Sequence, residues 1–155
     1  MKFYIASKFE NAEQVKRLSD VLRRWGWRQT YDWTEHGHVG HLGKERLREV
    51  AENEIRGVKD ADVVIILLPG GRGTHAELGA ANVLQKPVFI LSGTGEPFAV
   101  DNSTCAFYWN RNVKQVTGEL IELMGELLAF HQSLPREEVT YYYGDGRILR
   151  EMKEV

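Results

Sequence analysis

The stretch ADVVIILLPGGRGTHAELGAA, residues 61–81, decides the fold. Residues 62–68 form a short, continuous apolar run rich in β-branched side chains, which is typical of a central parallel strand covered on both faces. The Pro-Gly-Gly-Arg-Gly segment that follows predicts a tight turn, and residues from Thr74 onward have helical composition. This order places backbone N–H groups at a helix N-terminus, which favours an anion such as phosphate.

Glu77 stands in the first turn of this predicted helix, and two interpretations of it are open. Thr74-x-x-Glu77 matches a capping box, in which the Glu side chain returns to the backbone N–H at the start of the helix. Alternatively, the carboxylate faces a ligand held at the turn. Three glycines in residues 70–73 exceed the need of a tight turn and suggest the close approach of a ligand.

Strands and helices alternate outward from this stretch, which predicts an α/β fold: a doubly wound, flavodoxin-like or Rossmann-like parallel sheet of about five strands. The predicted strands are residues 2–7, 27–33, 62–68, 87–91 and the edge strand 106–109. The first predicted helix is capped by Asn11 and ended by Gly26, and Trp25 and Trp27 are expected in the core. The other predicted helices are residues 44–58, 74–84 and 113–130. We expect a single domain over residues 1–134. Residues 135–155 form a C-terminal extension, either a hairpin around a glycine turn, a loose tail or an arm that packs on a partner subunit.

Composition excludes several classes of function. A formal charge of −2 without a basic tract gives no support to binding of a nucleic acid polymer. No apolar stretch reaches membrane-spanning length, and the N-terminus acquires charge too early for a signal peptide. The single cysteine, Cys105, excludes an intrachain disulfide and a cysteine-only metal site. A reducing, cytoplasmic location fits best.

Glu54 is an anomaly in the second predicted helix. At about 100° per residue, it falls about 20° from Leu47, in the middle of the apolar stripe. That stripe comprises Leu47, Val50, Ala51, Ile55 and Val58. An ionised carboxylate is costly to bury without partners, so Glu54 either reaches water, pairs with a buried Arg, or lines a cleft. In a cleft near another carboxylate its pKa would rise, which suits a general acid.

The cleft of a doubly wound sheet lies at the carboxyl ends of its strands. The first strand delivers Ser7, Lys8 and Phe9 there, the second delivers Trp33, and the third delivers the glycine turn with Glu77. These are parts for holding a nucleotide: aromatic surface for the base, a nest for phosphate, and carboxylates for the sugar. The predicted substrate-binding residues are Ser7, Lys8, Phe9, Trp33, Gly70, Gly71, Arg72, Gly73 and Thr74. For Lys8 and Arg72, solvated surface charge is the alternative.

Together these motifs resemble the nucleoside 2-deoxyribosyltransferase family, which includes N-glycosidases of nucleoside 5′-monophosphates. The resemblance covers most of residues 2–110 and rests on three features. They are the opening strand Phe3-Tyr4-Ile5-Ala6-Ser7, an acidic residue eight positions before an Ala-Asp-hydrophobic strand, and Gly-x-x-x-Glu-Leu-Gly at residues 73–79. It implies that Glu77 is the nucleophile that attacks C1′, that Glu54 assists departure of the base, and that Tyr4 orients the nucleophile. It also implies a homodimer or larger assembly, with residues 113–130 as the expected contact surface.

The sequence departs from that family's pattern at three positions. Glu54 stands where the transferases usually carry Asp, Gly71 where related enzymes carry Asp or Ser, and Ser7 where a Gly usually follows the first strand. Residues 69–77 also resemble the PGGxGTxxE motif of LOG-type, cytokinin-activating phosphoribohydrolases, in which the glycines and threonine hold a phosphate. Both resemblances imply chemistry at an N-glycosidic bond with Glu77.

The sequence therefore predicts an enzyme that hydrolyses or transfers at the N-glycosidic bond of a nucleoside or nucleoside 5′-monophosphate. A helix N-terminus would keep Glu77 ionised while the less solvated Glu54 holds a proton. No cofactor and no metal are expected. His36, His38 and His41 form a loop cluster that lacks an evident fourth metal ligand, and a polar lid over the base is its preferred role. The alternative function is a non-catalytic nucleotide sensor on the same fold.

Overall fold

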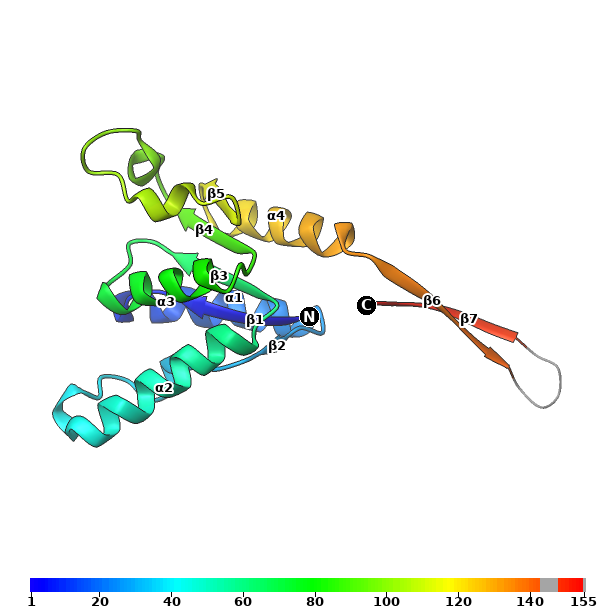
Figure 1. The fold of residues 1–155 in the computed structure, drawn as a ribbon, viewed down its shortest axis with the longest axis horizontal. Helices are drawn as coiled ribbons and strands as arrows, with labels where there is room; N and C mark the ends of the chain where they lie inside the picture. Colours follow the sequence, from blue (N-terminus) through cyan, green and yellow to red (C-terminus); the bar gives the residue numbers. More distant parts are fainter. Residues whose placement is uncertain (143–147, 155) are drawn as a thin grey trace. The chain divides into compact units, whose positions relative to one another are not determined.

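The computed structural model describes residues 1–142 and 148–154, with side chains described through residue 135. The chain divides into two compact units, Met1–Leu123 and Met124–Val155. The first unit contains an all-parallel sheet in the order β2-β1-β3-β4-β5 (Figure 1). Its strands are β1 (Lys2–Ala6), β2 (Arg28–Gln29), β3 (Val63–Leu67), β4 (Val88–Ser92) and β5 (Val113–Thr117). This confirms the predicted doubly wound α/β fold.

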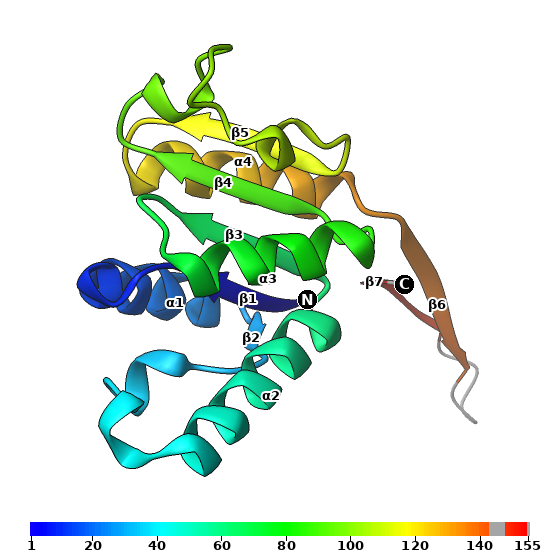
Figure 2. The same cartoon turned by 60° about the vertical axis from the view of Figure 1, so that its left-hand side comes forward.

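Helices cover the sheet on both faces. Helix α1 (Ala12–Arg24) lies on one face, and helices α2 (Lys44–Asp60) and α3 (Arg72–Val83) lie side by side on the other (Figure 2). Helix α4 (Leu120–Ser133) follows β5. Short 3-10 helices occupy the connections: η1 (Phe9–Asn11), η2 (Trp33–Glu35), η3 (Gly40–Leu42), η4 (Glu96–Phe98) and η5 (Ala106–Trp109). Among the described residues, no helix has the length and hydropathy needed to cross a membrane.

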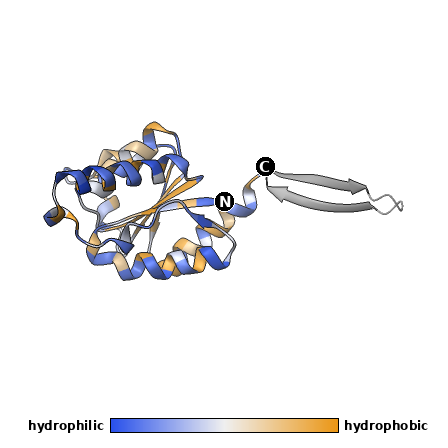
Figure 3. Cartoon of the chain, turned by 90° about the horizontal axis from the view of Figure 1, so that it is seen from below, coloured by the Kyte–Doolittle hydropathy of each residue, from blue (hydrophilic) through white to orange (hydrophobic). Residues whose placement is uncertain are grey.

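The core is centred on β1, β3 and β4. Every residue of β3 and β4 is buried, and so are four of the five residues of β1. These strands are the most apolar part of the sheet in Figure 3, whereas the helices turn polar faces outward. Burial on both faces explains why the strands read as continuous apolar runs rather than as alternating patterns.

The strand order reverses between β1 and β3. From β1 the chain crosses to β2 on one side, and from β3 it proceeds to β4 and β5 on the other. The loops that leave the carboxyl ends of β1 and β3 therefore part in opposite directions and open a crevice. In folds of this order, ligands bind at that switch point.

The last sheet strand lies later in the chain than the sequence predicts. Residues 106–109 form η5 rather than a strand, and residues 113–117 form β5 rather than the start of a long helix. Val116 is buried while Lys114 and Thr117 are exposed, so this segment is only partly covered, as expected of an edge strand. Gly118, with φ +127°, then ends the strand. Helix α4 begins only at Leu120, so the prediction of a helix over residues 113–130 is wrong at its N-terminal end.

The second strand is also shorter than predicted. Only Arg28 and Gln29 pair with β1, although the backbone N–H of Thr30 still donates to the Phe3 carbonyl. The chain then turns, because the Asp32 carboxylate accepts from the Thr34 backbone N–H at 3.1 Å and starts η2. Trp33 therefore lies in a 3-10 turn, where its indole N–H donates to the Ile5 carbonyl at 2.7 Å.

Two further predictions about α1 need correction. Trp27 is buried as expected, but Trp25 is 37% exposed. Asn11 occupies the N-cap position without capping the helix. In the second unit, β6 (Arg136–Tyr142) and β7 (Ile148–Glu154) pair as an antiparallel hairpin, as one reading of the tail predicts. The glycine turn itself lies outside the described residues.

Candidate active site

A pocket of about 450 Å³ lies at the carboxyl ends of β1 and β3. Its size is in the range of small-molecule sites. It is lined by Ser7, Lys8, Phe9, Glu10, Trp33, His36, Gly37, His38, Val39, Gly40, Val50, Glu54, Gly71, Gly73, Thr74 and Glu77. Most of the predicted site residues thus come together in one place. Tyr4, Gly70 and Arg72 do not line the pocket, and neither does the loop that follows β4.

Glu77 is a buried carboxyl at the pocket, held by Tyr4. Its residue is 5% exposed, and the Tyr4 hydroxyl donates a hydrogen bond to its Oε1. Tyr4 is fully buried in β1, so the phenol reaches Glu77 from beneath the pocket. The tyrosine is therefore a partner of the carboxyl rather than a lining residue.

The capping-box interpretation of Glu77 is wrong. Helix α3 begins at Arg72, and the Thr74 hydroxyl accepts from the backbone N–H of Gly71, the N-cap residue, at 3.1 Å. Thr74 therefore supplies the cap, and Glu77 lies in the second helical turn with its side chain committed to Tyr4. The Glu77 carboxyl therefore does not cap the helix.

The ionisation of Glu77 also differs from expectation. Burial raises the pKa of Glu77 to about 8; the Tyr4 hydrogen bond lowers it and the nearby Glu54 carboxylate raises it further. The predicted effect of the helix N-terminus does not prevail, because that effect fades within the first turn and Glu77 lies beyond it.

Glu54 lies on the buried face of α2, half-buried and lining the same pocket. The apolar stripe is narrower than predicted, because Leu47 and Ile55 are each 46% exposed. The buried positions are instead Val50, Gly57 and Val58, with Glu54 between them. Burial raises the pKa of Glu54, and the positive charge of a protonated His36 lowers it. Among the described residues Glu54 forms no ion pair, so the buried-Arg alternative is excluded there.

The glycine turn presents unused donors to the pocket. In the described part of the chain, no hydrogen bond engages the backbone N–H groups of Arg72, Gly73 or Thr74. Gly70 packs tightly against Thr74, because a Cβ on Gly70 would lie 2.7 Å from the Thr74 methyl group. The turn therefore has the form of an anion-binding nest at a helix N-terminus.

Aromatic rings and histidines form one wall of the pocket. Phe9 contacts His38 with ring centroids 3.9 Å apart and lies 6.4 Å from Trp33. His36 faces Tyr31, and its Nδ1 lies 2.9 Å from the Gly37 carbonyl. His41 is not part of the lining. Among the described residues, no three His, Cys, Asp or Glu side chains lie close enough to hold a metal ion.

The pocket thus brings two carboxyl groups together beside a glycine turn and an aromatic wall. The family model for nucleoside 2-deoxyribosyltransferase matches residues 3–128. The chain belongs to the nucleoside 2-deoxyribosyltransferase family. The protein is accordingly an enzyme of this kind, with activity at the N-glycosidic bond.

Two solved structures are similar to this chain. The CMP N-glycosidase BcmB from Clostridium botulinum is 16% identical with a TM-score of 0.57, covering 82% of this chain and 98% of that one. A 2-deoxyribosyltransferase from the psychrotolerant bacterium Bacillus psychrosaccharolyticus is 31% identical with a TM-score of 0.48, covering 66% of this chain and 77% of that one. A search of curated proteins finds no match. The first likeness shows the shared fold of the deoxyribosyltransferase family.

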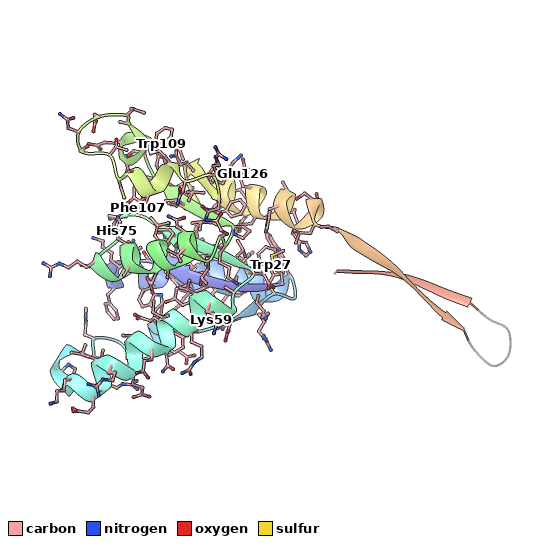
Figure 4. All side chains as sticks on the ribbon, viewed as in Figure 1. Trp27, Lys59, His75, Phe107, Trp109 and Glu126 are labelled. Carbon is pink, nitrogen blue, oxygen red and sulfur yellow. The ribbon has the colours of Figure 1, made fainter. Side chains whose placement is uncertain are left out.

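Sequence reasoning missed two residues that shape the site. Asn11 donates to the Ser7 hydroxyl at 2.9 Å and to the Pro69 carbonyl at 3.2 Å, so it links the ends of β1 and β3. Its polar side chain near a helix start read as a cap. His75, at the start of α3 (Figure 4), has its Nδ1 2.8 Å from the Gly71 carbonyl and its Nε2 2.8 Å from the Tyr108 hydroxyl. It holds the glycine turn against η5, and only its position beside the turn could have indicated this.

Proposed function

We propose that this deoxyribosyltransferase-family enzyme cleaves or transfers at the N-glycosidic bond of a nucleoside or nucleoside 5′-monophosphate, with Glu77 as the nucleophile. The observation that carries the proposal is the buried Glu77 carboxyl, hydrogen-bonded by Tyr4 and sharing one pocket with Glu54. A buried carboxyl and a half-buried one, beside a turn with the form of an anion-binding nest, suit glycosidic chemistry and have no evident structural purpose.

The proposed reaction has two steps. In the first, a Glu77 carboxylate oxygen bonds to C1′ of the sugar, the C1′–N bond breaks, and Glu54 gives its proton to the departing base. This leaves a glycosyl ester on Glu77 and an ionised Glu54. In the second, water or an acceptor base gives a proton to Glu54 and bonds to C1′, which releases Glu77. Water makes the enzyme a hydrolase, and a base makes it a transferase.

The proposed reaction needs the two carboxyl groups in opposite protonation states. The productive state carries one proton, on Glu54, and leaves Glu77 ionised. Burial raises the pKa of Glu77 to about 8, so burial works against this arrangement. The Tyr4 hydroxyl favours it by stabilising the ionised Glu77.

The remaining pocket residues suit the rest of a nucleotide. The unengaged backbone N–H groups of α3, with Arg72 and Lys8, would bind a 5′-phosphate. Phe9 and Trp33 would give the base an apolar surface, and the histidine loop would cover it. Ser7, whose hydroxyl donates to the Leu67 carbonyl at 2.7 Å, fixes the β1 edge of the pocket. BcmB is named a CMP N-glycosidase, so CMP belongs among the first substrates to test.

We also propose a homodimer or larger assembly in the cytoplasm. The family resemblance supports the assembly, and the lone cysteine, Cys105, supports a reducing compartment. The sequence predicts one long apolar helix over residues 113–130 as the contact surface between subunits. These residues form β5 and part of α4 instead, so we do not propose that helix as the contact surface. A non-catalytic sensor is disfavoured, because a sensor needs the phosphate nest but not two carboxyl groups.

The test is a panel of ribo- and deoxyribonucleosides and their 5′-monophosphates, with and without a second base, analysed by chromatography for free and exchanged base. We expect wild-type enzyme to release base from at least one member. Glu77→Gln should bind that substrate with similar affinity and lose turnover by several orders of magnitude. Comparable turnover by Glu77→Gln would remove Glu77 as the nucleophile.

A further inference from the structure

Helix α2 carries a glycine where its own stability would favour another residue. Gly57 is buried in the last turns of the helix, and its carbonyl accepts the backbone N–H of Ala61 at 3.2 Å. Its backbone is not left-handed, so no turn requires a glycine at this position. Since glycine is a poor helix former, its presence indicates a close approach from outside the helix.

The close approach is made by Tyr4. A Cβ on Gly57 would lie 2.8 Å from both Cδ2 and Cε2 of Tyr4, and 2.9 Å from Cβ of Tyr31. Carbon atoms normally pack at about 3.5–4.0 Å. A fully buried aromatic ring has no free end to swing aside, and Cβ of Tyr31 is fixed to the backbone. The ring of Tyr4 therefore rests directly on the backbone of α2.

We propose that Gly57 is a positioning residue for Glu77: the absent side chain lets the Tyr4 ring lie where its hydroxyl reaches the carboxyl. The proposal rests on the proposed role of Glu77. A methyl group at position 57 would displace the ring by about 1 Å. That displacement is enough to break a hydrogen bond whose useful range is only a few tenths of an ångström.

A second contact fixes the same backbone. The Thr30 hydroxyl lies 2.8 Å from the Gly57 carbonyl, to which it donates, and 3.2 Å from the Phe3 carbonyl. Thr30 thus links Gly57 of α2 to Phe3 of β1, the residue that precedes Tyr4. Loss of the hydroxyl would loosen the same approach without adding an atom, so Thr30→Val tests the idea independently of any clash.

The pH dependence gives a readout that general destabilisation would not move. The Tyr4 hydrogen bond lowers the pKa of Glu77, so its loss should raise the apparent pKa near 8 in the rate profile. A variant with a smaller folded fraction would lower the rate by the same factor at every pH and leave the apparent pKa unchanged. The titratable side chains that line the pocket with Glu77 are Lys8, Glu10, His36, His38 and Glu54, and Tyr4 reaches Glu77 from β1. Among the described residues, Tyr4 is the one that donates a hydrogen bond to the Glu77 side chain.

The experiment compares wild type with Gly57→Ala, Tyr4→Phe and the double variant. Gly57→Ala and Tyr4→Phe should each lower kcat by about a hundredfold, the cost of a misplacement of about 1 Å, with KM little changed. The double variant should be no slower than Tyr4→Phe, because both changes remove one hydrogen bond. Gly125→Ala is the matched control: Gly125 is an exposed helical glycine whose Cβ would meet nothing within 4 Å. It should keep the wild-type rate and profile.

Titration of the Glu77 carboxyl by carbon-13 NMR separates this proposal from the proposed function, because it requires no turnover. A raised Glu77 pKa in Gly57→Ala supports the proposal even if no substrate is found. An unchanged Glu77 pKa in Gly57→Ala overturns the positioning role of Gly57. So does a double variant whose rate loss is the product of the two single losses. Either result leaves the proposed role of Glu77 as the nucleophile intact. If Gly57→Ala does not fold, Thr30→Val decides: a raised Glu77 pKa supports the positioning role, and an unchanged one refutes it.

Discussion

Replacing Glu77 by Gln should change how the stability of the protein depends on pH. The pKa of Glu77 rises from an ordinary 4.5 to about 8 in the folded protein, chiefly through burial. Between these values the unfolded chain loses a proton that the folded chain keeps. The free energy of unfolding of the wild type therefore carries a contribution that is complete below pH 4.5 and is lost as the pH rises to about 8.

The magnitude follows from the size of the shift. One pKa unit corresponds to about 1.36 kcal/mol, so the full shift is worth about 5 kcal/mol. Glu77→Gln has a neutral side chain of the same shape in both states and avoids this loss. The difference in unfolding free energy between variant and wild type should be near zero at acidic pH. It should grow to several kcal/mol in favour of the variant at about pH 8, a large share of a typical domain's stability.

Urea unfolding followed by tryptophan fluorescence at several pH values provides the measurement, since the chain has four tryptophans. The dependence on urea should have the same slope in both proteins, which shows that the unfolded states are comparable. Gly125→Ala is the control, because no ionisable group changes and its difference from wild type should not vary with pH. Parallel curves for Glu77→Gln and wild type would refute the reasoning, since they would mean that Glu77 is ionised in the folded protein.

Three further outcomes are expected. Glu54→Gln should reduce base release while keeping nucleotide affinity within a few-fold and the melting temperature equal or higher. Its rate loss should be smaller for a nucleoside of a 7-methylated purine, because that base departs without protonation. Equal proportional rate losses on both substrates, with a large drop in melting temperature, would contradict the general-acid role. Gly70→Ala should displace Thr74 from the Gly71 N–H and raise KM for a 5′-monophosphate more than for the matching nucleoside, whereas equal changes would remove the phosphate nest. Sedimentation at micromolar concentration should show a dimer or larger species, and a monomer would argue against the proposed assembly.

The sequence predicted the structure well where the burial of a single strand or helix determines its own pattern of apolar residues. β3 and β4 are buried on both faces, so their apolar runs predict central strands directly. The glycine turn and the acidic position on α2 were also visible, because both break the pattern around them. The angular position of Glu54 placed it on the buried face even though the assumed stripe included the exposed Leu47 and Ile55.

Errors arose where one segment fits two periods or where a distant residue decides. Val113 and Val116 fit both a strand and a helix, and the glycine at position 118 was the overlooked signal for a strand end. Thr74 and Glu77 have capping-box spacing, yet the helix starts two residues earlier than predicted. The pKa of Glu77 is raised chiefly by burial against parts of the chain that are distant in sequence. Tyr4, which contacts the carboxyl, lies 73 residues away, and no local pattern reports such packing.

The central claim is that Glu77 forms a covalent bond to the sugar, and mass spectrometry of a single turnover tests it most directly. Enzyme in excess is mixed with the substrate identified in the panel, quenched in acid during base release, and digested for peptide mapping. The account predicts a glycosyl mass increment on Glu77, formed as base appears and absent from Glu77→Gln. Base release without any adduct, or an adduct on Glu54 instead, would contradict it.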